Sequence, residues 1–351
     1  MNNEKYDFSP DDFNLVGNTH EAFIDENYFK QSYWKDILLR FSKNKGAIAG
    51  MVFIFLIAFM AVIGPTMTEH TYKSQIISHQ NLAPRIKALE GLGIFDGSES
   101  MNTSTGTLEV NKYVSKDPAV TTGLEDTYYW FGTDVLGRDI FTRTWTGTRI
   151  SLYIALIAVI VDMLFGMSYG LISGYYGGRV DMLMQRFSEI LNGIPTLVLV
   201  TLLIIVLKPG LGTITLALAL TGWIGMSRIA RAQVLKLKEQ EFILASKTLG
   251  ATNLFIIFKE ILPNIFGQLI IMSMFSVPNA IFTEAFLAFV GLGVPQPMAS
   301  LGSLISDAFK SFTTHPYMII FPVMVLALVM LSFNLLADGL RDAFDPKMKE
   351  M

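Results

Sequence analysis

The sequence contains no cysteine and is short of charge. Only 16% of its 351 residues are charged, whereas soluble proteins average about 25%. Without cysteine there can be no disulfide bonds, thiolate metal ligands or thiol nucleophiles. The four histidines are not paired at metal-ligand spacing, so we expect no zinc site. A net charge of −3 argues against a nucleic-acid binder that relies on bulk positive charge, and 51% hydrophobic residues argue against an ordinary soluble protein.

The sequence motifs of several enzyme classes are also missing. The chain has no G-x-x-x-x-G-K-[ST] loop for nucleotide phosphates, no H-E-x-x-H zinc motif and no G-x-S-x-G nucleophile motif. We therefore expect a non-catalytic chain with no catalytic residue, no bound metal and no cofactor of its own.

The sequence does contain long apolar runs. A helix that crosses a bilayer needs about 20 largely uncharged residues, because it must cover roughly 30 Å at about 1.5 Å per residue. Six runs are suitable, and only Asp162 interrupts the second one. We expect transmembrane helices at residues 46–68, 150–178, 190–207, 209–227, 261–283 and 311–337. Pro195 and Pro278 are expected to kink the third and the fifth.

The basic residues indicate how these spans are oriented. Those just before the first span are Lys35, Arg40, Lys43 and Lys45. Because basic residues in short loops mark the cytoplasmic side, we expect an all-α polytopic membrane protein with six transmembrane helices and both termini cytoplasmic. The segment 69–148 is then external. Its polar middle, residues 98–107, is expected to be mobile, and without disulfides the segment must keep its shape by packing.

The cytoplasmic stretch between the fourth and fifth spans has a pattern of its own. Residues 240–249 have the apolar spacing of a helix, and Gly250 stands where a left-handed residue would end it. Thr252 or Asn253 can cap a second short helix, and Pro263 is predicted to turn the chain back into the fifth span. This spacing fits two structures equally well: an ordinary amphipathic connector, or a rigid elbow that transmits a displacement.

The same stretch carries a motif known from transporters. Glu241-x-x-x-Ala245-Ser246-x-x-x-Gly250, followed by Leu262-Pro263, resembles the EAA loop of the membrane subunits of ABC importers. In that family the loop forms the coupling helices that fit a groove on the cytoplasmic ATPase. The resemblance implies that the residues coupling this chain to an ATPase are Glu241, Ala245, Ser246, Gly250, Leu262 and Pro263. Two positions depart from the family's pattern: Ser246 replaces the second alanine, and Glu260 replaces an apolar residue.

Three further blocks, at residues 131–152, 284–297 and 334–346, resemble segments of peptide-type permeases. The tryptophan usual after the second block is Leu301 here. The resemblance implies a structural role for the signature residues Gly132, Asp134, Gly137, Arg138, Asp139, Glu284, Gly291, Gly293, Asn334, Asp338, Gly339, Arg341 and Asp342. The four blocks lie in the order expected for the second permease subunit of a peptide-type (dipeptide, oligopeptide or nickel) ABC importer.

The resemblance also implies an architecture and a set of partners. The fold would be that of a type I ABC importer permease in a bacterial plasma (inner) membrane, importing peptides by alternating access. Its partners would be a homologous permease subunit, two cytoplasmic ATPases that use ATP and Mg²⁺, an external solute-binding protein, the lipid bilayer and a peptide substrate. The implied divisions are a cytoplasmic tail 1–45, a first helix 46–68, an external segment 69–148, a core 149–340 with its coupling loop 228–263, and a cytoplasmic tail 341–351.

Several alternatives stay open. The chain could serve an importer of the same group for nickel or another small solute, act as an ion-coupled secondary transporter through Asp162 or Glu284, or be a non-transporting scaffold. A lone carboxylate in a span such as Asp162 more often makes a subunit contact or faces a wet crevice than relays protons. We favour a structural role for Glu284 over a place at the external mouth. The charges around Arg138 can bind a partner or fasten the external segment to the bundle.

Overall fold

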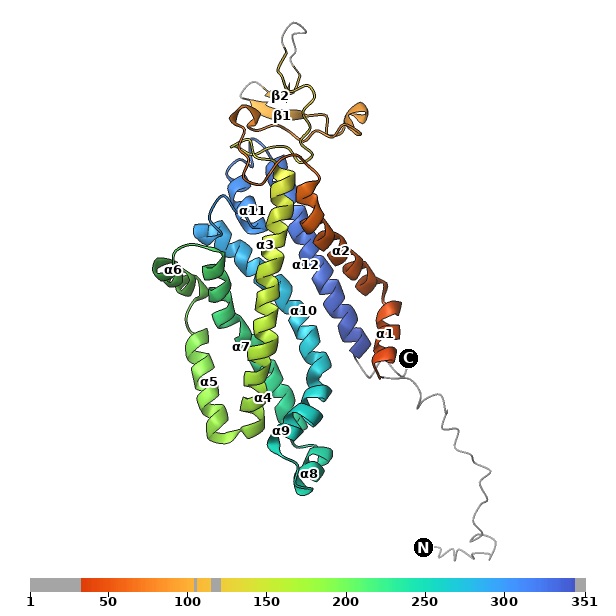
Figure 1. Ribbon diagram of the computed structural model, residues 1–351, viewed down its shortest axis with the longest axis vertical. Coiled ribbons are helices and arrows are strands. Elements are labelled where there is room, and N and C mark those ends of the chain that lie inside the picture. The colour runs from red at the N-terminus through yellow and green to blue at the C-terminus, as the bar shows by residue number, and fades with distance from the viewer. Residues whose placement is uncertain (1–32, 104–105, 115–120, 345–351) are drawn as a thin grey trace, which may run out of the picture.

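The computed structural model describes residues 33–103, 106–114 and 121–344, which form an elongated bundle of helices (Figure 1). Most of the predicted N-terminal tail and residues 345–351, with the end of the last signature block, lie outside the described residues. The α-helices are α1 (Tyr33–Lys43), α2 (Lys45–Ile63), α3 (Ile140–Val161), α4 (Met167–Tyr176), α5 (Gly178–Asn192), α6 (Thr196–Leu207), α7 (Leu211–Leu237), α8 (Glu241–Thr248), α9 (Asn253–Phe255), α10 (Leu262–Leu287), α11 (Leu301–Phe309) and α12 (Tyr317–Phe344).

Shorter elements join or extend these helices. The π-helical segments are Asp162–Gly166 between α3 and α4, Ile256–Ile261 between α9 and α10, and Ala288–Leu292 after α10. The 3-10 turns are Gly64–Thr66, Ile77–His79 and Glu90–Leu92. The strands are β1 (Ser98–Thr103) and β2 (Gly106–Asn111).

The predicted all-α membrane fold is confirmed, with one change to the third span. Within the described residues, the helical stretches long and apolar enough to cross a bilayer are Lys45–Thr66, Ile140–Tyr176, Leu211–Leu237, Asn253–Leu292 and Tyr317–Phe344. A sixth span exists only if α5 and α6, which are bent by 77° at Pro195, count as one. The predicted kink at Pro195 is therefore confirmed, but it divides the predicted span 190–207 between two helices. Proline cannot donate the backbone hydrogen bond that would continue α5, and α6 alone is only 12 residues long.

Two helices begin where the apolar runs do not. The second span starts at Ile140 rather than 150, because Asp139 caps α3 and polar residues such as Arg143 are buried rather than in a loop. The last span starts at Tyr317 rather than 311, because a separate short helix, α11, precedes it. Ser300 and Ser303 start α11 with a reciprocal capping box, a signal that the search for long apolar runs passed over.

We call the end of the bundle formed by residues 64–139 and 293–316 the hairpin end. The expectation of a mobile loop at 98–107 is wrong for its described residues, because β1 and β2 pair in antiparallel register from Ser98 with Asn111 to Thr103 with Gly106. The two strands satisfy each other's backbone groups, so they need no apolar core to form. His315, before α12, joins the hairpin to the bundle through an Nδ1–Oε2 contact of 2.8 Å with Glu99.

The hairpin end keeps its shape without disulfides, as expected, by packing around buried polar side chains. Arg85 is 4% exposed and lies over the rings of Tyr113 and Tyr128, with its guanidinium carbon 5.0 and 4.7 Å from their centroids. Its Nη2 donates to Glu90 at 2.6 Å. Burial raises the pKa of Tyr129 nearby to about 12. The segment is therefore a packed cap on the bundle.

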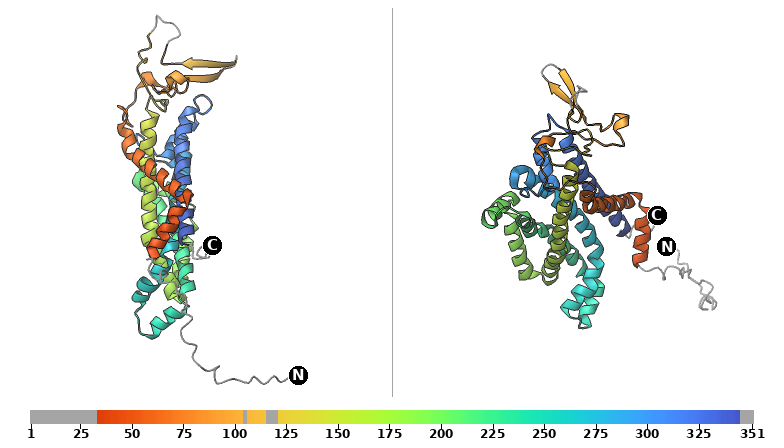
Figure 2. Two further views of the ribbon diagram at one scale, coloured as in Figure 1. Left: turned by 90° about the vertical axis from the view of Figure 1, so that its right-hand side faces the viewer. Right: turned by 45° about the horizontal axis from the view of Figure 1, so that its top comes forward.

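The helices pack in two tight pairs. On one flank α2 lies against α12, which Figure 2 shows with that flank turned toward the viewer. In the centre α4 lies against α7, and half of the apolar part of α7 is buried inside the bundle. Large apolar side chains elsewhere point outward, among them Phe55, Ile205, Val206 and Met324. This apolar exterior suits a lipid environment.

Candidate functional site

The elbow, residues 241–255, lies at the end of the bundle opposite the hairpin end (Figure 1). After α8 the chain passes through Gly250 at φ +83°, a backbone region that side chains disfavour. The Gly250 N–H donates to the Lys247 carbonyl and the Ala251 N–H donates to the Ser246 carbonyl, each at 3.0 Å, which is the Schellman pattern. The Thr252 hydroxyl then caps α9. The predicted helix–glycine–helix geometry is confirmed.

The predicted turn at Pro263 is wrong. Pro263 lies at the start of α10, within a helical stretch that is continuous from Asn253 to Leu292. Proline has no N–H to donate to a helical hydrogen bond. The π-helical segment just before Pro263 accommodates this, and there the Leu262 N–H donates to the Ile257 carbonyl. The second arm of the elbow is thus the tip of a membrane-spanning helix. A displacement of the elbow therefore passes directly into α10.

One apolar residue anchors α8, whereas its other apolar residues face outward. Ile243 has no exposed surface and packs with Ile256 and Ile257 and with residues of α4 and α7. The large apolar side chains exposed on the elbow and directly after it are Phe242, Leu244, Leu249, Leu254, Phe255 and Phe258. Leu249, next to the bend, is 88% exposed. A cluster of this kind on a polar end of the molecule indicates a protein-binding surface.

Polar contacts tie the two arms of the elbow to each other and to α4. The Ser246 hydroxyl donates to Glu260 Oε1 at 2.5 Å, so the two departures from the family motif form one hydrogen bond. Glu260 Oε2 is buried without a partner among the described residues. The Tyr175 hydroxyl, at the end of α4, donates to Asn253 at 2.9 Å, and Lys247 Nζ lies 5.3 Å from the centre of the Tyr175 ring.

The other predicted coupling residues surround the same joint. Leu262 packs against the apolar cluster around Ile243, whereas Ala245 and Pro263 are exposed. Glu241 is exposed at the start of α8 and forms no ion pair among the described residues.

The pair formed by α4 and α7 connects the elbow to the membrane part of the bundle. Gly166, Gly170 and Gly174 recur every four residues along this stretch and face α7. A Cβ atom on Gly170 would lie 2.3 Å from the Ser227 carbonyl oxygen. Such close backbone contact lets two helices move as one body. The sequence shows this glycine spacing, but the search for spans and motifs did not use it.

The first signature block forms a buried polar cluster at the hairpin end. Asp134 accepts hydrogen bonds from its own turn, and its Oδ2 lies 2.5 Å from Nε of Arg138, which is 3% exposed. Asp139 caps α3 by accepting from the N–H groups of Phe141 and Thr142. Burial raises the pKa of Asp139, and the hydrogen bonds that Asp139 accepts from Thr142 offset only part of that rise. Gly132 and Gly137 form the turns with positive φ. The sequence left two roles open for the charges around Arg138, which were to bind a partner or to fasten the external segment to the bundle. These buried contacts favour the second role.

The second and third signature blocks also make structural contacts. Glu284 has no exposed surface and bonds to Ser151 of α3 at 3.3 Å, beside the turn at Gly291 and Gly293. In α12, Gly339 packs against Ala47 of α2 with no room for a side chain. Asp342 accepts a 2.9 Å hydrogen bond from Asn44. The other signature residues there, Asn334, Asp338 and Arg341, lie on α12, half-buried or exposed. The structure therefore brings the first two signature blocks into contact, through Ser151 with Glu284 and Arg138 with Gln296, whereas the third lies apart, where α12 meets α2.

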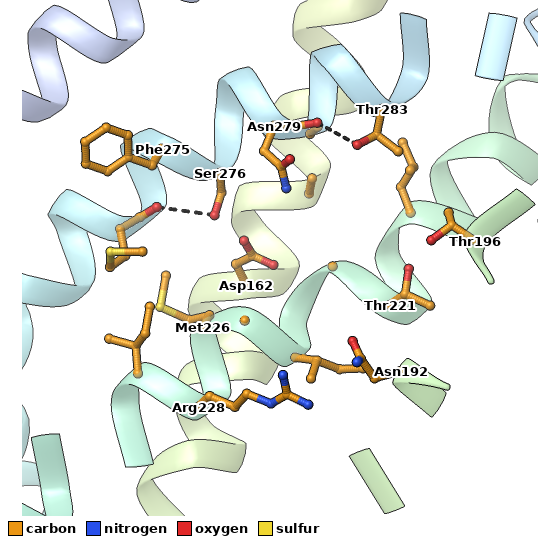
Figure 3. Close-up of a pocket in the computed structure, with 18 residues that line it drawn as sticks. Asp162, Asn192, Thr196, Thr221, Met226, Arg228, Phe275, Ser276, Asn279 and Thr283 are labelled. Carbon is orange, nitrogen blue, oxygen red and sulfur yellow. Dashed lines mark hydrogen bonds between the residues drawn. The ribbon is translucent and has the colours of Figure 1, made fainter. Parts of the chain in front are cut away.

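A polar cavity that sequence reasoning missed lies inside the bundle (Figure 3). Its volume is about 530 Å³, and its walls are the junction of α3 with α4, the break between α5 and α6, α7 and α10. Asp162 points into it. The polar residues that line it with Asp162 are Asn192, Thr196, Thr221, Arg228, Ser276, Asn279 and Thr283. The spacing of the last three along α10 was a signal that the sequence offered.

Comparisons with known proteins agree with these features. Residues 166–350 match the family model described as "Binding-protein-dependent transport system inner membrane component", and residues 32–84 match the "N-terminal TM domain of oligopeptide transport permease C". The chain is 43% identical to the oligopeptide transport system permease protein OppC of Bacillus subtilis, over 91% of each chain. It is 42% identical to the dipeptide transport system permease protein DppC of the same organism, over 91% of this chain and 87% of that protein.

One solved structure completes the comparison. A chain of the methionine ABC transporter MetNI, in an inward-facing conformation, has a TM-score of 0.49 and 15% identity, with 58% of this chain and 97% of that chain covered. The matched family model spans more than half of this sequence, and the two Bacillus permeases match along nearly all of it. The chain therefore belongs to the family of binding-protein-dependent transport system inner membrane components.

Proposed function

We propose that this chain is the second permease subunit of an ATP-driven importer that carries peptides into the bacterial cytoplasm. The relatives that support a peptide substrate are oligopeptide and dipeptide permeases that match along most of their length. The structural observation that carries the proposal is the elbow. It combines an exposed apolar tip for a partner with a rigid bend and a direct continuation into the membrane-spanning helix α10.

The elbow end is the cytoplasmic end in this proposal. Basic residues gather near it, on the end of α7 and around the elbow, as the rule for cytoplasmic segments requires: Arg228, Arg231, Lys236, Lys238, Lys247 and Lys259. Two ATPase subunits dock there. They bind the ATP and Mg²⁺, because this chain has no nucleotide-binding motif of its own. The chain itself contributes no catalytic residue. A binding protein delivers the peptide to the hairpin end.

Transport then follows from a difference in affinity. When ATP closes the two ATPases, they bind one position of the elbow better than the other, which shifts the permease between inward-open and outward-open states. α10 moves with the elbow because the second arm of the elbow is the tip of the same helix, and α4 and α7 follow because Tyr175 and Ile243 link them to the elbow. In this scheme residues 149–340 form the core that moves, and a homologous permease encloses the other half of the path.

The Gly250→Val variant tests this proposal. A branched side chain at φ +83° strains the bend, while nothing lies within 4 Å of the new Cβ atom, so the fold has room for it. In proteoliposomes that hold the complete importer, we expect uptake of trialanine to fall at least about tenfold while ATP hydrolysis continues. The matched control is Gly123→Val at the hairpin end, where φ is +73° and the surroundings are equally open. Normal uptake by Gly250→Val would overturn the proposal.

A further inference from the structure

The polar cavity has the size and the wall chemistry of a binding site. Its volume of about 530 Å³ falls in the range of small-molecule pockets, about 300–1,000 Å³. One wall is the break between α5 and α6, where Asn192 and Thr196 line the cavity inside a membrane-spanning bundle. Non-helical backbone at that depth is tolerated where it is buried in protein or lines a water-filled cavity. The cavity is therefore a place where a polar solute can reside.

Asp162 gives the cavity a buried carboxylate without a cationic partner. Its side chain is 5% exposed and forms no ion pair among the described residues. Ser276 of α10 faces it in the cavity (Figure 3). Charged groups inside spans are costly and are kept for a function, usually with a partner. A metal ion does not fit this role, since no group of three ligating side chains exists within the described residues.

Arg228 gives the cavity a positive charge at another edge, the lower one in Figure 3. Its side chain is exposed and, in the part of the chain that the structure describes, has neither an ion pair nor a hydrogen bond. Asp162 reaches α7 at Gly222, where a Cβ atom would lie 3.7 Å from its Oδ1. Arg228 follows six residues later on the same helix, roughly 9 Å along its axis. The two charged side chains thus line one cavity without forming an ion pair with each other.

Amide and hydroxyl groups line the other walls of the cavity. Ser276, Asn279 and Thr283 form one polar face of α10, and Asn192 and Thr221 face them from the other walls (Figure 3). A short peptide presents the complementary groups: an ammonium group at one end, a carboxylate at the other and amides between. An extended chain covers about 3.3–3.6 Å per residue, so three residues span roughly 10 Å.

We propose that the polar cavity is a transient binding site for peptides of about three residues in transit. Asp162 binds the amino-terminal ammonium group, Arg228 binds the carboxyl-terminal carboxylate, and Asn279 with its polar neighbours binds the amide groups. This inference rests on the proposed function, because only a peptide importer would pass such a ligand through the bundle. It adds a selection step inside the permease, after any selection by the binding protein.

Chemical labelling tests the site without the binding protein. The chain lacks cysteine, so Asn279→Cys supplies its single thiol, and labelling is read on this chain alone. We expect a water-soluble maleimide to label this thiol in the complete permease–ATPase complex in nanodiscs. Millimolar trialanine should slow labelling at least about threefold, whereas acetyl-trialanine amide, which lacks both terminal charges, should not. Leu249→Cys, which is exposed at the elbow and far from the cavity, should be labelled equally fast with and without trialanine.

Charge removal completes the test. Asp162→Asn should abolish protection by trialanine and lower trialanine uptake at least tenfold, in a complex that still assembles with its ATPase subunits. Glu284→Gln is the matched control, because Glu284 is an equally buried carboxylate that does not line the cavity. Unchanged protection and uptake in Asp162→Asn, or no labelling of Asn279→Cys, would overturn the inference and make Asp162 a subunit contact. If the wild-type importer did not take up trialanine at all, the proposed function itself would fail.

Discussion

The two ends of this bundle are built on opposite principles. At the hairpin end, charged side chains are buried and bonded: Arg85, Arg138 and Asp139 are each at most 4% exposed. At the elbow end, the short helix α8 is held by the buried Ile243, by the hydrogen bond from Ser246 to Glu260 and by the contact of Lys247 with the Tyr175 ring, while large apolar side chains face outward. One end is closed by polar networks, and the other leaves apolar surface open.

This difference teaches how one chain can combine a fixed part with a moving part. Buried charges that are bonded to one another specify one arrangement, because a displacement leaves them unpaired in a medium of low dielectric constant. Elements with few buried contacts open and move at low cost in free energy. The hairpin end is therefore suited to hold the outer ends of α3, α11 and α12 in place. The elbow is suited to change position when a partner binds.

The largest effect should come from breaking the polar network at the hairpin end. Arg138→Met leaves Asp134 without its 2.5 Å partner and removes the bond to Gln296. Loss of one member of a buried ion pair costs about 3–5 kcal/mol, and two backbone N–H donors still compensate Asp134, so we expect a loss of about 3 kcal/mol. The free energy of unfolding can be measured by SDS titration of the complete complex in mixed micelles.

The control for this variant is another arginine in an ion pair. Arg186 bonds to Glu189 at 2.9 Å, but the two side chains are 75% and 52% exposed, so Arg186→Met should change stability within the error of the measurement. If both variants lost the same stability, burial would not distinguish the two pairs. The contrast between a fixed and a movable end would then lose its physical basis.

The sequence predicted the elbow much better than the parts that depend on tertiary contacts. Gly250 and the apolar spacing before it encode a local bend, and local backbone preferences can be read from one segment. The continuous helix through Pro263 could not be read in this way, because the π-helical segment that accommodates the proline forms within the packed α4–α7–α10 core.

The polar cavity was out of reach for the same reason. Asp162, Asn192 and Thr221 come from three separate stretches, and each looks like an isolated polar residue in an apolar run. Only the fold brings them together. The signature block around Asp134 is an intermediate case. Its residues could be identified from the family motif, but only the structure shows that they are buried.

A second, smaller effect is expected from the single side-chain bond across the elbow. Ser246→Ala removes the donor to Glu260 and leaves that carboxylate with both oxygens unpaired. Hydrogen bonds to charged groups contribute about 1.5–3 kcal/mol, and about 1.4 kcal/mol corresponds to tenfold. Amide hydrogen exchange in α8 of the complete complex should therefore accelerate at least about tenfold, with no change at the hairpin end.

Two further variants show whether this effect belongs to the bond. Thr248→Ala on the same helix removes a hydroxyl that bonds only to the preceding turn, at Leu244, and should leave exchange nearly unchanged. The double variant Ser246→Ala with Glu260→Leu replaces both partners by apolar groups and should return exchange to within about threefold of the wild type. Equal exchange in Ser246→Ala and Thr248→Ala would show that the hydrogen bond to Glu260 does not hold α8.

The smallest effect is a pH dependence that should appear at the hairpin end alone. Burial, and to a lesser degree the charge of His70, lowers the pKa of His79 below its usual 6.5, and Nδ1 of His79 lies 2.6 Å from the Tyr129 hydroxyl. As pH falls below 6.5, the opened segment binds a proton more readily than the folded one, so stability falls until the folded His79 is itself protonated.

Hydrogen exchange of residues 77–86 measures this dependence. After correction for intrinsic exchange rates, opening of this segment should be up to about threefold more frequent at pH 5.5 than at pH 7.5. His79→Gln should remove the difference, which separates His79 from His70 and His315 at the same end. The elbow contains no histidine, so its amides are an internal reference that should not respond. An equal response at both ends would assign the pH effect to the bundle as a whole, and the hairpin end would no longer be a separately stabilised unit.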